Sequence, residues 1–302
     1  MNMAVQNRRP GKCAVAEAAP FRLRSICRCR GSLIAILSCM SLIVVVLFGF
    51  SPGCGTLAGD RGWGQDATLA PGWDRVGRAA WNAAIAPETW VPAAGALALG
   101  INHADQDVQE WAATKTPVFR SQANANKMSD VLWSASSAVW LASGVAAPSG
   151  ADSDVWIANK AKGLGLETGA GIALRSFVGH RKNTMNRTSP NGADQDGYLS
   201  VHAAGSAFYA TLASRHVDAF DWPDGAVMAS RAGLGALTAA TAWARVEADQ
   251  HYPADVLKSI ALGHFFGAFV TDAFLGQDNP RQAMVLFEPS KAGMLAMVLF
   301  AF

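Results

Sequence analysis

From Trp73 to Leu275 the chain is a succession of Ala-rich segments whose apolar residues recur at helical spacing. Small residues allow helices to pack closely, and most runs are interrupted before they are long enough to cross a bilayer. We therefore expect an all-α fold, a compact helical bundle over residues 73–280. Ser129, and Asp152 or Ser153, are candidate N-caps. The candidate helices cover residues 73–86, 89–101, 104–115, 129–146, 153–179, 201–215, 225–245 and 254–275.

The segments on either side of these helices differ from them in composition. Residues 55–72 are Gly-rich and aperiodic, which predicts a flexible tether. In residues 281–302 two short apolar runs flank the turn-rich sequence EPSKAG. This pattern predicts a small C-terminal β-hairpin. One hairpin cannot close a barrel, so we expect a ribbon packed on the bundle.

Residues 1–54 have the order of an export signal. A basic region is followed by GSLIAILSCMSLIVVVLFGF, residues 31–50, which are 20 residues without a charge. This length also suffices for an anchor that spans a bilayer. Gly53 and Cys54 follow directly and resemble a bacterial lipoprotein cleavage site, at which Cys54 would be lipidated. A lipoprotein, an uncleaved anchor and simple secretion stay open. Each predicts an exported protein of the cell envelope, tethered to a membrane in the periplasm in the first two cases.

Charge and cysteine content limit the kinds of site in the remaining chain. The chain has 25 basic and 23 acidic residues, but seven of the basic residues and one acidic residue precede position 31. The remainder holds 18 basic and 22 acidic residues, a net charge of −4. This balance does not favour nucleic acid, whose binding requires a basic face. No cysteine follows Cys54, which excludes disulfides, thiolate metal sites and a cysteine nucleophile from the bundle.

Three polar clusters interrupt the helices, each at a helix end. They read HRKNTMNRTSPNG at 180–192, GYLSVHAAG at 197–205 and RVEADQHYPADVL at 245–257. Each alone has an ordinary structural explanation. A basic run complements the C-terminal end of a helix dipole, a Ser is a common N-cap, and a His before Pro253 suits a turn.

Together the clusters predict an anion site with a nucleophile. The cations Lys182, Arg187 and Arg245 can converge on a phosphate. The helix start at Ser200 offers free backbone N–H groups to the same anion. Asp255, four residues after His251, can fix the imidazole tautomer and leave the other nitrogen to attack. His202 can then donate a proton. The candidate residues are His251, His202 and Asp255 for catalysis, and Lys182, Arg187, Ser200 and Arg245 for phosphate binding, with neither a metal nor a cofactor.

In this order, the clusters resemble the three motifs of the type 2 phosphatidic acid phosphatase and vanadium haloperoxidase superfamily, K-x6-R-P, P-S-G-H and S-R-x5-H-x3-D. Here they read KNTMNRTSP from Lys182, LSVH ending at His202, and ARVEADQHYPAD ending at Asp255. The resemblance covers roughly residues 125 to 275. It implies the helical bundle of that superfamily and a phosphohistidine at His251, supported by Asp255, with His202 protonating the leaving oxygen. It further implies that Lys182 and Arg245 neutralise the phosphate and that Ser200 forms hydrogen bonds with it. The implied substrate is a phosphorylated lipid or a small phosphate ester.

Three positions depart from the motifs. Ser189 stands where an Arg is usual, and Arg187 could partly substitute for it. Leu199 replaces a Pro and Val201 replaces a Gly. A glycine at that position would let the backbone approach a phosphate closely. Losing one such charged contact can cost about a hundredfold in rate, so weakened activity or an unusual substrate is expected. The alternatives are an unselective periplasmic acid phosphatase, a haloperoxidase, which the missing Arg disfavours, and a non-catalytic lipoprotein that retains the fold.

The remaining histidines are expected to have structural positions. His264 lies on an apolar helix face, in the sequence ALGHFFGAF, and is expected in the core or at an interface. His103, His180 and His216 are expected at solvent or capping positions.

Overall fold

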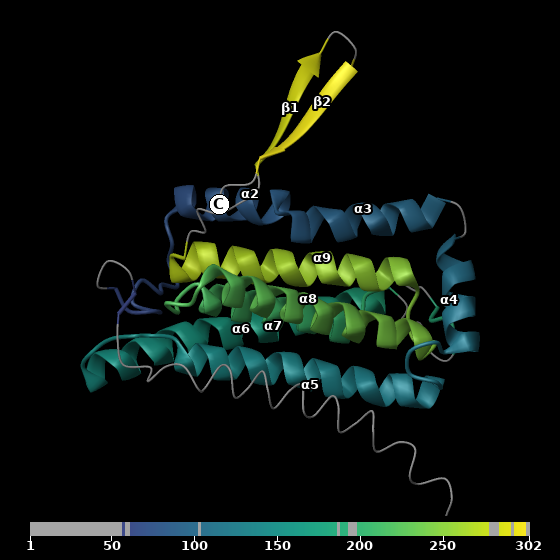
Figure 1. The fold of residues 1–302 in the computed structure, drawn as a ribbon, viewed down its shortest axis with the longest axis horizontal. Helices are drawn as coiled ribbons and strands as arrows, with labels where there is room; N and C mark the ends of the chain where they lie inside the picture. Colours follow the sequence, from purple (N-terminus) through teal and green to yellow (C-terminus); the bar gives the residue numbers. More distant parts are fainter. Residues whose placement is uncertain are drawn as a thin grey trace, which may run out of the picture. The chain divides into compact units, whose positions relative to one another are not determined.

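The computed structural model describes residues 56–57, 61–101, 104–185, 188–192, 198–277, 284–290 and 293–299. The expected signal or anchor and Cys54 lie outside these residues. The described chain is predominantly helical, which confirms the all-α class and agrees with a helical bundle (Figure 1). The helices are α2 (Trp73–Ile85), α3 (Pro87–Ile101), α4 (Ala104–Lys115), α5 (Gln122–Ala146), α6 (Ser153–Met185), α7 (Val201–Val217), α8 (Asp224–Glu247) and α9 (Pro253–Val270), followed by the π-helical turn η1 (Thr271–Leu275).

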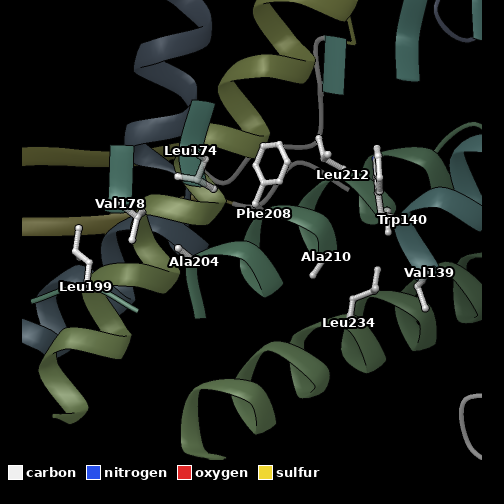
Figure 2. Close-up of a cluster of buried hydrophobic side chains, with 11 residues drawn as sticks. Val139, Trp140, Leu174, Val178, Leu199, Ala204, Phe208, Ala210, Leu212 and Leu234 are labelled. Carbon is white, nitrogen blue, oxygen red and sulfur yellow. The ribbon is translucent and has the colours of Figure 1, made fainter. Parts of the chain in front are cut away.

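Helix α7 is the centre of the packing and contacts α5, α8 and α9 extensively. Small residues allow the closest of these approaches. A Cβ atom on Gly263 of α9 would lie 2.1 Å from the carbonyl oxygen of Ala204 on α7. The largest apolar cluster gathers side chains from α5, α6, α7 and α8 around the fully buried Phe208 (Figure 2). Burial of each large apolar side chain of this kind contributes about 1.5–3 kcal/mol.

Helices α2 and α3 lie along α9 (Figure 1). They are consecutive and are bent by 51° at the break between them. Within the described chain, no single helix is both long and apolar enough to cross a membrane, whereas the bent α2–α3 pair meets both conditions by length and composition.

Two helix boundaries differ from the prediction by more than one turn. Helix α5 begins at Gln122 with Ser121 as its N-cap, whose side chain accepts a hydrogen bond from the backbone N–H of Asn124. Ser129 is therefore a buried residue inside the helix and not a cap. Helix α6 extends to Met185, so Lys182 belongs to its C-terminal end, although the Lys182 side chain lies outside what the structure describes.

The prediction of a flexible tether over residues 55–72 is wrong for residues 61–68. The Trp63 side chain is fully buried and belongs to an apolar cluster with Val270 and Leu275. Its backbone N–H donates to the carbonyl of Pro148 at 2.8 Å, and Thr68 donates to the carbonyl of Phe274 at 2.9 Å. This segment therefore packs on the bundle before α2 begins.

At the C-terminal end, strands β1 (Met284–Ser290) and β2 (Gly293–Leu299) pair antiparallel, with Met284 opposite Leu299. Their side chains lie outside the described part of the chain. The expected packing of a hairpin on the bundle stays a prediction.

Candidate functional site

Arg245, at the C-terminal end of α8, is a buried cation held against α5. Its Nη1 donates to Asn126 Oδ1 at 2.7 Å and to Ser129 Oγ at 3.2 Å, and its Nη2 donates to Gln250 Oε1 at 3.2 Å. Burial lowers the pKa of Arg245, while the nearby Asp130 carboxylate opposes that shift. Its Nε is buried and has no partner within the described residues. A bound anion would satisfy such a donor.

The turn between α8 and α9 is held in place by other parts of the chain. Asp249 adopts a left-handed conformation with φ of 60°, and its carboxylate accepts a hydrogen bond from Gln109 of α4. Its carbonyl accepts from the backbone N–H of Asn191 at 3.3 Å. The segment at 188–192, which carries the end of the first cluster, is therefore attached to the third.

Glu247 fixes the same turn from its other side. This fully buried carboxylate accepts hydrogen bonds from the backbone N–H groups of Val118 and Phe119, each at 2.9 Å, and from Trp243 Nε1 at 2.6 Å. The connection between α4 and α5 is thus bound to the end of α8. These three hydrogen bonds give the Glu247 carboxylate a structural role.

His251 and Asp255 are both buried, one just before α9 and the other in its first turn. Pro253 occupies the first turn of the helix, where a missing backbone N–H costs nothing. The backbone N–H of Ala254 donates to Asp105 Oδ1 of α4 at 2.7 Å. Asp255 Oδ1 accepts from Lys258 Nζ at 3.2 Å. This part of the third cluster therefore lies inside the protein and not in an exposed loop.

The N-terminus of α7 is joined to this turn through a single serine. Ser200 is the N-cap of α7, and its hydroxyl accepts from the backbone N–H of Ala203 at 3.3 Å. The backbone N–H of Ser200 donates to Ser259 Oγ at 2.8 Å, and Ser259 Oγ donates to the carbonyl of Asp255 at 2.6 Å. The second and third clusters therefore meet where α7 and α9 both begin.

His202 lies on the first turn of α7 and contacts α5. Its Nε2 is 2.8 Å from Asp130 Oδ1, so Nε2 carries the hydrogen that is shared with the carboxylate. Its ring makes an edge contact with Trp133, with ring centroids 5.9 Å apart. The His202 side chain is 27% exposed, which leaves it accessible to a substrate. Arg245 and His202 thus contact neighbouring positions of one stretch of α5, from Asn126 to Asp130.

A cavity of about 130 Å³ borders this helix start. Its lining is mainly apolar and includes Trp133, which also contacts His202, and Val201, the residue that replaces a motif glycine. Arg175 and Tyr209 supply its polar groups. Leu199, the second departure, is buried in the apolar cluster of Figure 2. The two apolar replacements therefore contribute to packing and to the wall of this cavity.

A second polar cluster, which sequence reasoning missed, is fully enclosed. His216 Nε2 is 3.0 Å from Glu167 Oε1, and its Nδ1 is 2.9 Å from Ser143 Oγ. Trp140 Nε1 donates to Glu167 Oε2 at 2.6 Å. The expectation of a solvent or capping position for His216 is wrong, because its side chain has no exposed surface and its partners come from two other helices. Ser143, His216 and Glu167 are all completely buried, so this cluster holds the core together and is closed to a substrate.

The structure thus brings five of the predicted residues to one region: Arg245, His251, Asp255, Ser200 and His202. Arg187 and the side chain of Lys182 lie outside the described residues. The α5 residues Asn126, Ser129 and Asp130 were missed as site residues. Their only signal in the sequence is a group of polar side chains ahead of an apolar run.

Within the described part of the chain, no group of three or more His, Cys, Asp or Glu side chains could hold a metal ion. Comparison with known proteins found no family model, no curated protein and no solved structure that matches this chain.

Proposed function

We propose that the chain is a metal-independent phosphatase that hydrolyses a phosphate monoester or pyrophosphate, preferably a lipid phosphate, through a phosphohistidine intermediate. One observation carries the proposal. Arg245 at the end of α8 and His202 at the start of α7 both contact residues 126–130 of α5. Ser259 joins Ser200 at the start of α7 to Asp255 in the first turn of α9. A buried cation, a helix N-terminus and two histidines can together supply the charge stabilisation, nucleophile and proton donor for metal-free phosphoryl transfer.

The proposed reaction has two steps. A ring nitrogen of His251 attacks phosphorus, the bond from phosphorus to the ester oxygen breaks, and His202 protonates the leaving oxygen. His202 then takes a proton from water, whose oxygen attacks phosphorus, so that phosphate leaves and His251 is restored. Asp255 orients His251, while Arg245, Lys182, Arg187 and the N–H groups at Ser200 neutralise the phosphoryl oxygens.

The preference for a lipid substrate is supported by the cavity beside His202. Its mainly apolar walls would accept the apolar part of a leaving group while the phosphate lies against α7. The remaining assignments belong to the same proposal: a bundle of the phosphatidic acid phosphatase and haloperoxidase type with a small C-terminal hairpin, export to the cell envelope, and attachment to a membrane through residues 1–54 by an anchor or lipidated Cys54.

The test is phosphate release from a panel of lipid phosphates, a water-soluble ester and pyrophosphate. We expect His251→Ala to abolish release, because the nucleophile is lost, and wild type quenched under alkaline denaturing conditions to carry acid-labile phosphate on His251 by mass spectrometry. His264→Gln is the matched control, since His264 is on α9, the helix that follows His251, and bonds to Thr89 Oγ1 at 2.7 Å, away from the site. Full activity in His251→Ala would end the mechanism. Release from none of the substrates would favour a non-catalytic protein with this fold.

A further inference from the structure

Helices α2 and α3 present an apolar surface on the side that does not contact α9. Trp81 of α2 is 66% exposed, and Leu97 and Ile101 of α3 are 71% and 76% exposed. Trp90, Leu97 and Ile101 are spaced by seven and four residues, which places them in one stripe along the helix. The exposed large side chains of this surface, called the α2–α3 face below, are Trp73, Trp81, Trp90, Val91, Leu97 and Ile101.

The composition of α3 indicates that its exposed side contacts another apolar surface. Among its 15 residues Glu88 alone is charged, and apolar residues occur both on the side against α9 and on the exposed side. A helix that is apolar all round is normally buried all round. Large exposed apolar surfaces on soluble proteins often mark interaction sites. The bent α2–α3 pair also has the length and apolarity of a membrane segment.

Two observations identify the cover as lipid. Trp is the residue most typical of the boundary between membrane and water, and three of the six exposed side chains of the face are Trp. The charges along both helices cancel, with Arg75 and Arg78 against Asp74 and Glu88. A surface without net charge suits a zwitterionic lipid surface.

The path of the chain would bring the bundle near a membrane. Only 12 residues separate the end of the uncharged run at 31–50 from Trp63, which is buried in the bundle. Twelve fully extended residues reach about 40 Å at most. The chain then passes to the start of α2 at Trp73. Insertion of residues 31–50, or lipidation of Cys54, would therefore hold the bundle close to the bilayer.

We propose that the α2–α3 face lies on the bilayer surface as a second membrane attachment, with its Trp side chains at the headgroup level and Leu97 and Ile101 against the acyl chains. The two attachments together fix the orientation of the bundle on the membrane. This role does not depend on the proposed catalysis.

The experiment places the full chain in phosphatidylcholine vesicles that contain a lipid-soluble photoactivatable carbene probe and maps the labelled peptides by mass spectrometry. We expect labelling of α2–α3 peptides together with the 31–50 peptide. Peptides of α8, where Met228 is an apolar side chain 69% exposed on another helix, should stay at background. Raising the salt concentration should not change the pattern, because the face carries no net charge.

The double variant Leu97→Glu with Ile101→Glu should lose the α2–α3 label and keep the 31–50 label, since two charges oppose burial in lipid. Both positions are exposed, and circular dichroism checks that the helices persist. Met228→Glu on α8 should leave all labelling unchanged. Background labelling of α2–α3 beside a labelled 31–50 peptide would overturn the proposal. Cross-links from the α2–α3 face to residues 31–50, to β1–β2 or to a second copy would overturn it as well and would name the actual cover.

Discussion

Asp130 shows how a single exposed residue can matter for the site without stabilising the fold. Its side chain is 64% exposed, and its bond to His202 lies at the edge of the bundle. Exposed pairs of this kind contribute little stability, about 0–1 kcal/mol. Orientation of the His202 ring is therefore the main consequence of the contact.

We predict that Asp130→Asn lowers kcat for substrates with poor leaving groups and leaves kcat for a nitrophenyl ester nearly unchanged. A poor leaving oxygen needs a proton from an oriented His202, whereas nitrophenolate departs without one. The measurement is kcat for a series of esters of rising leaving-group pKa, with the unfolding midpoint in urea as the check on the fold. An equal loss for every ester would assign Asp130 a purely structural role.

Ser189 gives a second prediction at this scale. Restoring the motif with Ser189→Arg should lower the free energy of unfolding and raise kcat/KM little, because Ser189 is only 6% exposed and a buried charge is costly unless paired. Thr188→Arg, at the exposed neighbouring position, is the matched control and should be close to neutral. Urea unfolding and kcat/KM decide the matter. A gain of about tenfold or more in rate without a loss of stability would show that the site has room for the guanidinium.

At the scale of elements, the contact between α7 and α9 sets the geometry of the site, because both helices begin there. Gly263 lies four residues after Ser259, the serine that joins the two helix starts. A Cβ atom at Gly263 would meet Ala204 of α7 at its backbone oxygen. The glycine therefore keeps the helices close enough for the Ser200–Ser259 bond.

We predict that Gly263→Ala destabilises the protein by about 1–3 kcal/mol through overpacking, although alanine alone would favour a helix by about 1 kcal/mol. Activity should fall with it, since separation of α7 from α9 moves the phosphate-binding N–H groups. Gly233→Ala in α8 is the matched control, because open space surrounds that position and a small gain is expected. Urea unfolding of both variants provides the comparison. Equal effects in the two variants would contradict the close-packing argument.

Periodicity predicted the helices well, and the errors have physical causes. The start of α5 was predicted at Ser129 because the residues before it are polar, yet Asn126 and Ser129 are inside the helix and bind Arg245. Their separations from Arg245, 119 and 116 residues, carry no local pattern. The motif spacing, in contrast, located Arg245, His251 and Asp255 around one turn, because all three depend on the same local chain path.

The tether was misjudged for a related reason. Glycine normally indicates freedom of the chain, but Gly62 is required for close contact: a Cβ there would lie 2.2 Å from the carbonyl oxygen of Ser149. This contact seats Trp63 in the core. A single buried aromatic residue in an aperiodic segment leaves no periodic signal, so its burial becomes evident only in three dimensions.

At the scale of the whole molecule, the enclosed cluster around His216 links three helices with the segment that precedes α2. Lys160 of α6 is buried there, and its Nζ donates to the carbonyls of Gly144, at 2.5 Å, and Ala147 on α5 and its C-cap. The same ammonium group lies 4.9 Å from the centre of the Trp63 ring. One side chain thus connects α5, α6 and the N-terminal segment.

Burial lowers the pKa of Lys160 to about 8, against the opposing effect of the Glu167 carboxylate. The unfolded chain binds this proton more tightly than the folded chain does. Deprotonation of Lys160 therefore raises the free energy of unfolding between about pH 8 and 10.5, and this gain is lost as the pH falls through 8. We predict that this rise is absent in Lys160→Met. Subtracting the free energy of unfolding of the variant from that of wild type removes the contribution of other groups, such as Tyr209, whose raised pKa acts in the opposite direction. Lys162→Met, at an exposed position two residues away, should retain the rise. Urea unfolding across this range measures it; parallel pH profiles for wild type and Lys160→Met would show that Lys160 keeps its proton in the folded core.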